Sequence, residues 1–170
     1  MTYASLFGAA TAAGAYVIIP IPPVPITLQT LFLMLAGALL GAKTAALSQI
    51  VYILIGIIGL PVFAGGKAGL GVLFGPTGGY LTGFIAGAWI IGRLLEKAQN
   101  PGTARIALSM IAGTLAVYTL GIAQLCLVAK LSIPKAAAVG ALPFMPGDAL
   151  KIAAACFIIR KVRGSTGVRI

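Results

Sequence analysis

The sequence has no histidine and only two acidic residues, Glu96 and Asp148, among 170 positions. It therefore lacks the paired carboxylates of acid–base catalysis and the clustered side chains that hold a catalytic metal. Its two cysteines, Cys126 and Cys156, lie inside apolar runs, where a thiol behaves as a small hydrophobic group without an activating base. The composition thus argues against an enzyme, and we expect neither a metal nor a cofactor.

Charge of either sign is scarce: 8% of residues are charged, 60% are hydrophobic, and the mean hydropathy is +1.10. Such values are typical of an integral membrane protein. Apolar runs that approach the ~20 residues of a membrane-crossing helix recur along the chain. We predict an all-α integral membrane protein in which residues 1–170 form a single six-transmembrane-helix bundle. The predicted spans are Tyr3–Ile19, Ile26–Leu40, Ala45–Leu60, Thr77–Ile91, Ile106–Val128 and Asp148–Ile159.

The basic residues predict how this bundle is oriented. With a cytoplasmic N-terminus, eight basic residues fall on the cytoplasmic side: Lys43, Arg93, Lys97, Arg105, Arg160, Lys161, Arg163 and Arg169. Three fall outside, namely Lys67, Lys130 and Lys135. This excess of inner positive charge predicts that both the N- and C-termini are cytoplasmic. The net charge of +10 then reflects contact with anionic membrane lipid, and we expect no nucleic-acid partner.

The same orientation brings three unusual segments to the outer side: Pro20–Pro25, the glycine-rich Gly65–Gly79 and the approach Pro143–Asp148. Proline stiffens a connection, and glycine lets the backbone come close to a ligand. Non-helical backbone at membrane depth is tolerated where it is buried in protein or lines a cavity. We therefore predict an outward-facing pocket for a small molecule.

Simpler interpretations of these segments stay open. Pro20–Pro25 is equally explained as a rigid turn, and glycines within membrane helices often serve close packing. The stretch Gly65–Gly71 superficially resembles a phosphate-binding loop, but Ala68 follows Lys67 where Ser or Thr is required, and no strand precedes it. The chain therefore has no credible ATPase motif, and energy for any active transport must come from partners.

Asp148 and Lys151 place an acid and a base one helical turn apart beside an apolar run. An acid costs up to ~2.5–3.5 kcal/mol at the bilayer centre on insertion scales, so intramembrane ionisable residues are candidates for function. The alternative is that Asp148 caps a helix N-terminus while Lys151 pairs with it and extends towards the surface.

Several blocks resemble one family. They are PIPPVPITLQTLFLMLAGALLG at Pro20–Gly41, GLPVFAGG at Gly59–Gly66, GLGVLFGPTGGYL at Gly69–Leu81 and PFMPGDALK at Pro143–Lys151. In this order and spacing they are similar to the BioY family, the biotin-specific substrate-binding S components of energy-coupling factor (ECF) vitamin importers. The resemblance implies a multi-pass protein of a prokaryotic cell membrane that binds biotin without a cofactor. It also implies as partners an ECF coupling transmembrane subunit and two ATPase subunits.

The resemblance assigns the ureido ring of biotin to the Pro-Gly-Asp-x-x-Lys motif: Asp148 would accept its N–H groups and Lys151 would donate to its oxygen. The glycine-rich segment offers backbone donors for the valerate carboxylate. Polar and aromatic side chains would complete the pocket. The further candidates are Gln29, Phe63, Gly65, Gly66, Lys67, Gly69, Gly71, Thr77, Gly78, Gly79, Tyr80, Phe144 and, as another aromatic, Phe74.

The first apolar run carries small residues at intervals of four, which let helices approach closely in lipid. The resemblance implies that this face docks on the coupling subunit, through either Gly8 and Ala12 or Ala9 and Ala13. Internal packing of the bundle is the alternative. Two other functions stay open: a stand-alone biotin channel or facilitator, and an S component for another vitamin.

Overall fold

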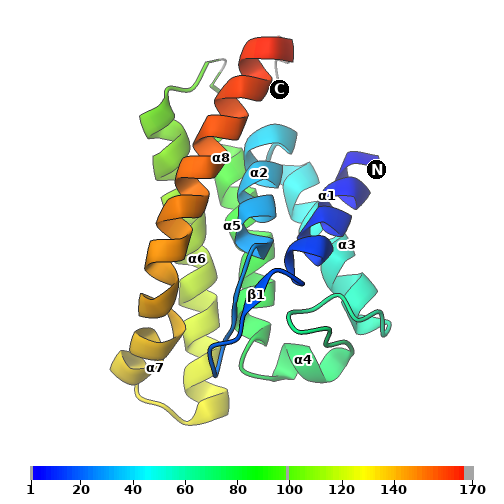
Figure 1. The fold of residues 1–170 in the computed structure, drawn as a ribbon, viewed down its shortest axis with the longest axis vertical. Helices are drawn as coiled ribbons and strands as arrows, with labels where there is room; N and C mark the ends of the chain where they lie inside the picture. The colour runs from blue at the N-terminus through cyan, green and yellow to red at the C-terminus, as the bar shows by residue number, and fades with distance from the viewer. Residues whose placement is uncertain (1, 99, 167–170) are drawn as a thin grey trace.

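The structure is a computed structural model that describes residues 2–98 and 100–166. Helices dominate the fold (Figure 1). In chain order the elements are α1 (Thr2–Gly14), β1 (Ile18–Ile19), β2 (Ile26–Thr27), α2 (Gln29–Leu40), α3 (Ala42–Ile57), α4 (Leu70–Phe74), α5 (Gly78–Leu95), α6 (Thr103–Ala129), α7 (Ile133–Gly140), the 3-10 helix η1 (Leu142–Phe144) and α8 (Met145–Thr166).

Each of the six predicted spans corresponds to a helix, but the helices begin and end at other residues than predicted, most clearly in the first and the last. The first helix ends at Gly14, and Ile18–Ile19 pairs with Ile26–Thr27 as a short antiparallel ribbon. The ribbon holds the proline link, where Pro residues lack the N–H that would continue a helix. The sixth helix begins at Met145, so Asp148 lies in its first turn. The short helices α4 and α7 were not predicted, because their runs are brief.

Among the described residues, three helical stretches are long and apolar enough to cross a membrane: Gly78–Leu95, Thr103–Ala129, and Ile133–Val162, which comprises α7, η1 and most of α8. The apolar helices α2 and α3 are shorter. Many large apolar side chains on the outside are exposed, for example Leu127 at 80% and Phe157 at 70%. Such an apolar exterior is expected of helices that face lipid, so the chain is built as a multi-pass membrane protein.

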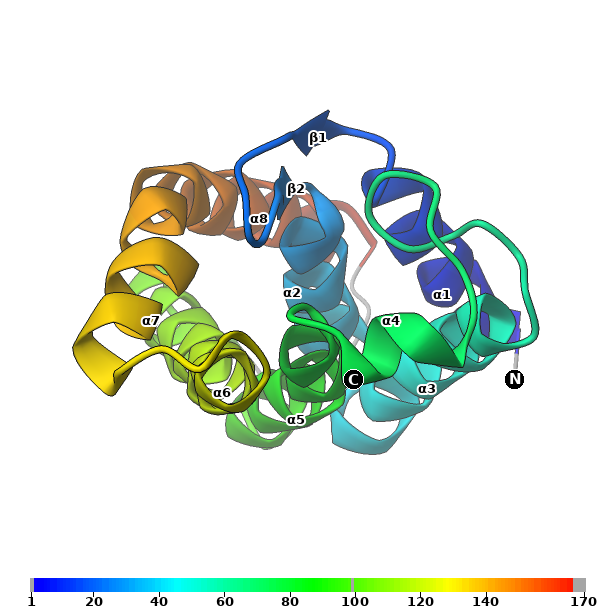
Figure 2. The same cartoon turned by 90° about the horizontal axis from the view of Figure 1, so that it is seen from below.

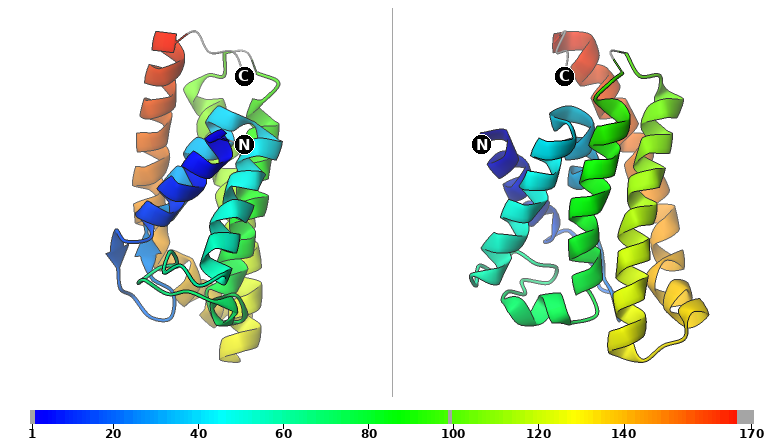
Figure 3. Two further views of the ribbon diagram at one scale, coloured as in Figure 1. Left: turned by 90° about the vertical axis from the view of Figure 1, so that its right-hand side faces the viewer. Right: turned by 180° about the vertical axis from the view of Figure 1, so that it is seen from behind.

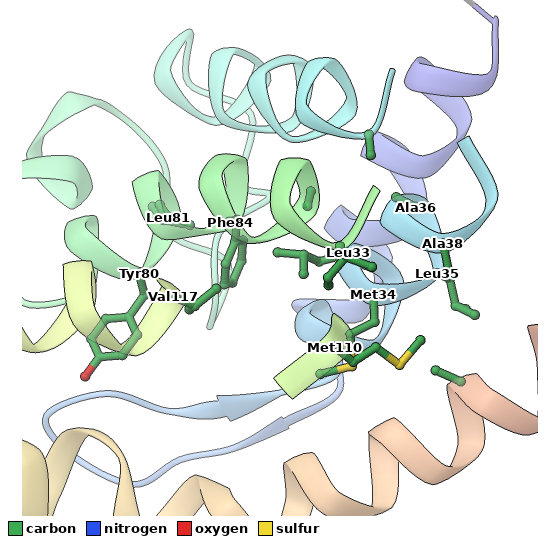
Figure 4. Packing of buried hydrophobic residues seen from close by; sticks show 14 of the residues in the cluster. Leu33, Met34, Leu35, Ala36, Ala38, Tyr80, Leu81, Phe84, Met110 and Val117 are labelled. Carbon is green, nitrogen blue, oxygen red and sulfur yellow. The ribbon is translucent and has the colours of Figure 1, made fainter. Parts of the chain in front are cut away.

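Glycines allow the close contact of α5 with α6. A Cβ atom added at Gly83 would lie 2.8 Å from Val117 Cα, and one at Gly87 would lie 2.9 Å from the carbonyl oxygen of Gly113. A small-residue interface of this kind lets two membrane helices pack backbone to backbone. Leu81, Phe84 and Val117 continue the contact as part of the apolar core, which also includes Leu33 and Met34 of α2 (Figure 4).

The two ends of the bundle differ. The start of α1 and the end of α8 lie at one end, together with the α2–α3 turn (Figure 1). The opposite end carries the β1–β2 ribbon, α4 and α7, and Figure 2 looks directly onto it. Gln124 of α6 fixes part of this second end, because its Nε2 donates to the carbonyl oxygens of Leu73 at 2.6 Å and Gly75 at 2.8 Å.

Candidate binding site

A cavity lies at the end that carries the β1–β2 ribbon. It is lined by the proline link and β2, by the first turn of α2, by the α3–α4 connection and by α5, α6, η1 and α8. The lining residues are Val24, Pro25, Ile26, Thr27, Gln29, Thr30, Phe63, Ala64, Lys67, Val72, Thr77, Tyr80, Leu81, Phe84, Val117, Tyr118, Phe144, Asp148 and Lys151. The cavity has a volume of about 80 Å³ and opens to the surface.

Asp148 and Lys151 form a buried acid–base cluster in this cavity. Their side chains are 7% and 9% exposed, and Lys151 Nζ lies 3.0 Å from Asp148 Oδ1. Thr30 of α2 joins the two, since its Oγ1 accepts from Lys151 Nζ at 2.9 Å and donates to Asp148 Oδ1 at 3.3 Å. Tyr118 of α6 donates its hydroxyl to Asp148 Oδ2. Three helices thus converge on one carboxylate.

The position of Asp148 bears on its alternative role as a helix cap. It lies in the first turn of α8, where a carboxylate is favoured by the helix dipole. The hydrogen bonds that its oxygens accept come from the side chains of Thr30, Tyr118 and Lys151. The carboxylate is therefore directed into the cavity and across to neighbouring helices.

Gln29 and Tyr52 form a second polar contact beside the cluster. Gln29 is 3% exposed, donates to the hydroxyl of Tyr52 and accepts from Thr27 Oγ1 at 2.9 Å. The Tyr52 hydroxyl donates in turn to the carbonyl oxygen of Val62 at 3.2 Å. This chain of hydrogen bonds fixes the Gln29 side chain in the cavity wall and ties α2 to the α3–α4 connection.

Aromatic rings form much of the remaining wall. Phe144 stacks on Tyr118 at 6.4 Å between ring centroids and meets Tyr80 edge to face at 6.5 Å, both within the usual range for aromatic pairs. The Tyr80 hydroxyl donates to the carbonyl oxygen of Gly140 at 2.8 Å, so Tyr80 offers its ring to the cavity. Phe63 packs edge to face on Tyr52 at 5.7 Å, in space left by the absent side chain of Gly56.

Lys67 and Thr77 also line the cavity, but the candidate glycines do not. Gly66 and Gly69 donate their N–H groups to carbonyl oxygens of the chain, and Gly78 donates to Gly75. A Cβ added at Gly79 would lie 2.3 Å from the carbonyl oxygen of Leu120, so this glycine serves the contact of α5 with α6. Gly65 and Gly71 are exposed, as is Phe74.

The candidate docking residues of α1 face in two directions. Gly8 is buried, and a Cβ added there would lie 3.0 Å from the carbonyl oxygen of Ser48 on α3. Ala12 is half-buried, and it packs against the apolar core. Ala9 and Ala13 are exposed on the outer face of the helix. Of the two candidate pairs, only Ala9 and Ala13 both lie on the surface.

The sequence analysis missed Thr30, Tyr118 and Phe84 as cavity residues. A hydroxyl or a ring within an apolar helix gives no local pattern that separates a ligand contact from packing. Thr30 is separated by 118 residues from the carboxylate to which it donates. Its position next to Gln29 was the one available signal, because two consecutive polar residues interrupt an apolar run.

Fold and site together define a multi-pass membrane protein that has a polar and aromatic cavity at one end of its helix bundle. The family model of BioY matches residues 1–167, and the chain belongs to the BioY family. The Biotin transporter BioY of Thermotoga maritima is 42% identical over 160 residues, which cover 94% of this chain and 93% of that protein.

Similarity extends to an archaeal relative and to a solved structure. The Probable biotin transporter BioY of Pyrococcus horikoshii is 37% identical over 162 residues, 95% of this chain and 94% of that protein. A crystal structure of the S-component for biotin from an ECF-type ABC transporter matches with a TM-score of 0.89 and 29% identity, and covers 96% of this chain and 90% of that one.

Proposed function

We propose that this chain is the membrane-embedded biotin-binding subunit of an ECF importer. The observation that carries the proposal is the buried Asp148–Lys151 cluster, which lies in a cavity of a fold that matches a biotin S-component. Such a cluster offers an acceptor and a donor side by side away from water. A cyclic urea, with two N–H groups and one carbonyl oxygen, is the complementary ligand.

Binding of the ureido ring would exchange partners within the cluster. In the structure, Asp148 Oδ1 accepts from Thr30 and Lys151, while Oδ2 accepts from Tyr118. In the complex, Lys151 would turn its ammonium group to the ureido oxygen and free Asp148 to accept from the ureido N–H groups. Charge-assisted hydrogen bonds of this kind are about twice as strong as neutral ones, and they orient the ligand.

The valerate carboxylate of biotin would bind near Lys67. Asp148 and Lys151 neutralise each other, so Lys67 supplies the unbalanced positive charge among the ionised groups of the lining. Thr77 offers a hydroxyl beside the N-terminus of α5, where the helix dipole favours an anion. The rings of Phe63, Tyr80 and Phe144 would enclose the apolar thiolane between the two polar ends. The glycines would contribute by shaping the loop.

We further propose six membrane spans with both termini in the cytoplasm. Two features support this: α1 begins and α8 ends at the same end of the bundle (Figure 3), and that end carries basic residues such as Arg93, Arg105 and Arg160. The shorter helices α1, α2 and α3 would cross a locally thin part of the bilayer. Reporter tags at Met1 and Ile170 should both read cytoplasm, and a tag at Ser132 should read outside. Opposite readings for the two termini would contradict the topology.

ATP-driven uptake would need the coupling subunit and two ATPases, because the chain has no phosphate-binding loop of its own. The exposure of Ala9 and Ala13 supports this outer face of α1 as the docking surface, since small residues admit a partner helix closely. Gly8, which packs on α3, is better explained by internal packing.

Titration of the purified chain with biotin, riboflavin and thiamine, without partner subunits, tests the proposed function. A binding subunit should capture biotin tightly and ignore the other two vitamins at the same concentration. Weak biotin binding, together with biotin flux through vesicles that contain this chain alone, would indicate a facilitator. Tight binding of riboflavin or thiamine instead would indicate an S component for another vitamin.

A further inference from the structure

A further cavity lies at the opposite end of the molecule from the candidate binding site, between the α2–α3 turn and the last turns of α5. It is a cleft of about 540 Å³ that is open to the surface. Its lining residues are Leu40, Gly41, Ala42, Lys43, Thr44, Trp89, Arg93 and Glu96. None of these residues lines the biotin cavity, so the two sites share no wall.

The second cavity has two basic residues and one acidic residue, so one basic residue lacks a counter-charge. Glu96 accepts from Arg93 Nη1 at 2.5 Å and from the backbone N–H of Ala42 at 3.3 Å, so both of its oxygens are engaged. Arg93 is 51% exposed and keeps further N–H donors free of Glu96. Within residues 2–98 and 100–166, Lys43 has no ion pair. The lining thus carries one net positive charge, with two cationic groups at its rim.

Trp89 gives the cavity an apolar side. It precedes Arg93 by one helical turn, so both side chains lie on the same face of α5, and it is 47% exposed. Tryptophan is enriched at the level of lipid headgroups, where its ring meets acyl chains and its N–H meets polar groups. The cavity therefore combines exposed cations with an aromatic ring, a combination that complements the anionic headgroup and the apolar chains of a phospholipid.

We propose that this cavity binds the headgroup of an anionic phospholipid, such as phosphatidylglycerol. Lys43 and Arg93 would contact the phosphate, and the start of an acyl chain would lie along Trp89 and Leu40. Charge complementarity favours an anionic over a zwitterionic lipid, because the lining keeps one uncompensated cation.

Trp89 is the only tryptophan in the sequence, so its fluorescence reports on this site alone. The experiment places the purified protein in phosphatidylcholine bilayers and replaces part of the lipid with brominated phosphatidylglycerol or with brominated phosphatidylcholine. Bromine quenches a tryptophan that it contacts. We expect phosphatidylglycerol to quench at lower mole fraction, by about fivefold for one basic group that attracts an anionic lipid. The preference should shrink at high salt.

Two substitutions connect the preference to the cavity. Lys43→Gln removes the unpaired cation and leaves the Arg93–Glu96 pair intact, so it should abolish most of the preference. Lys161→Gln removes an exposed cation at the same end outside the cavity lining, and it should leave the preference unchanged. Biotin binding serves as the folding check for both variants.

Equal quenching by the two brominated lipids in the unmodified protein would overturn the proposal. A preference that Lys43→Gln and Lys161→Gln lower equally would also overturn it, because the attraction would then be spread over the whole basic end. If Lys43→Gln instead abolished assembly with the coupling subunit without changing the quenching, the cavity would be a protein contact and the lipid proposal would fail.

Discussion

Replacing Asp148 by alanine removes an acceptor that three side chains share. Lys151 would keep the Thr30 hydroxyl as a partner at 2.9 Å, and Tyr118 would lose the oxygen to which it donates. Both members of the pair are less than a tenth exposed, so water cannot easily replace the missing carboxylate. The Asp148→Ala variant would therefore lose the proposed acceptor for the ureido N–H groups and leave a buried ammonium group without its counter-charge.

The expected loss follows from comparable truncations of one member of a buried charge pair, which cost about 2–5 kcal/mol of affinity. This corresponds to about a 30-fold to several thousand-fold rise in the biotin Kd. Asp148→Asn should lose less, because one acceptor oxygen remains. Isothermal titration of the purified variants with biotin measures both effects, and gel filtration in detergent identifies folded protein.

The alternative role of Asp148 as a helix cap makes a different prediction. Loss of a cap costs about 1 kcal/mol of stability and leaves ligand affinity nearly unchanged. Near-native biotin binding by folded Asp148→Ala would refute the binding role and support the cap. A large loss of affinity in Asp148→Ala with a smaller loss in Asp148→Asn would support the direct contact.

Three further predictions concern Lys67, Glu96 and α1. Lys67→Gln should weaken biotin more than biotin amide in the same titration, and equal weakening of both ligands would exclude a carboxylate contact. The Arg93 guanidinium, and then the Ala42 N–H, lower the pKa of Glu96 below its unfolded value of about 4.3. The ionised carboxylate therefore stabilises the fold above that value, and this stability is lost as pH falls through the lower folded pKa. The unfolding temperatures of the protein and of Glu96→Gln should differ most near neutral pH and converge in acid. A difference in unfolding temperature that grows in acid would contradict the lowered pKa of Glu96. Ala9→Leu with Ala13→Leu should keep biotin binding and lose co-purification with the coupling subunit, while Gly8→Leu should impair folding and binding together. Failure of folding in the first variant would exclude docking.

Sequence analysis located the six longer helices because lipid imposes a strong constraint: a chain that crosses a bilayer must be apolar over most of a helix. It singled out Asp148 and Lys151 because charged residues are costly in lipid, so an acid and a base stand out in an apolar chain. The ribbon of β1 and β2 was not predicted, because two-residue strands have no periodic pattern to detect. The first predicted span was accordingly too long by the residues that follow Gly14.

The glycines were less informative about the site than the charged residues were. Gly78 and Gly79 stand at the start of a helix, and the same residues suit a backbone that approaches an anion or a helix that approaches another helix. A Cβ at Gly78 would lie 1.7 Å from the carbonyl oxygen of Leu73, which shows that packing alone already requires a glycine there. One sequence cannot separate the two uses, because both depend on the absence of the same atom. The two uses differ only in what the glycine faces, a ligand or another part of the chain. That neighbour belongs to a different segment, so the local sequence does not reveal it.

A buried acid–base pair is weak evidence that the pair stabilises the fold. Burying two charges costs more than their mutual attraction returns unless further hydrogen bonds complete the geometry, and apolar replacements of similar volume are often as stable or more so. Here Thr30 and Tyr118 complete it, each from a different helix. The Thr30 hydroxyl bonds to both charged groups and the Tyr118 hydroxyl to the carboxylate, which fixes the geometry of the pair. Because these hydrogen bonds complete a costly pair without making it a source of stability, they favour the proposed role of the cluster in binding over a purely structural one.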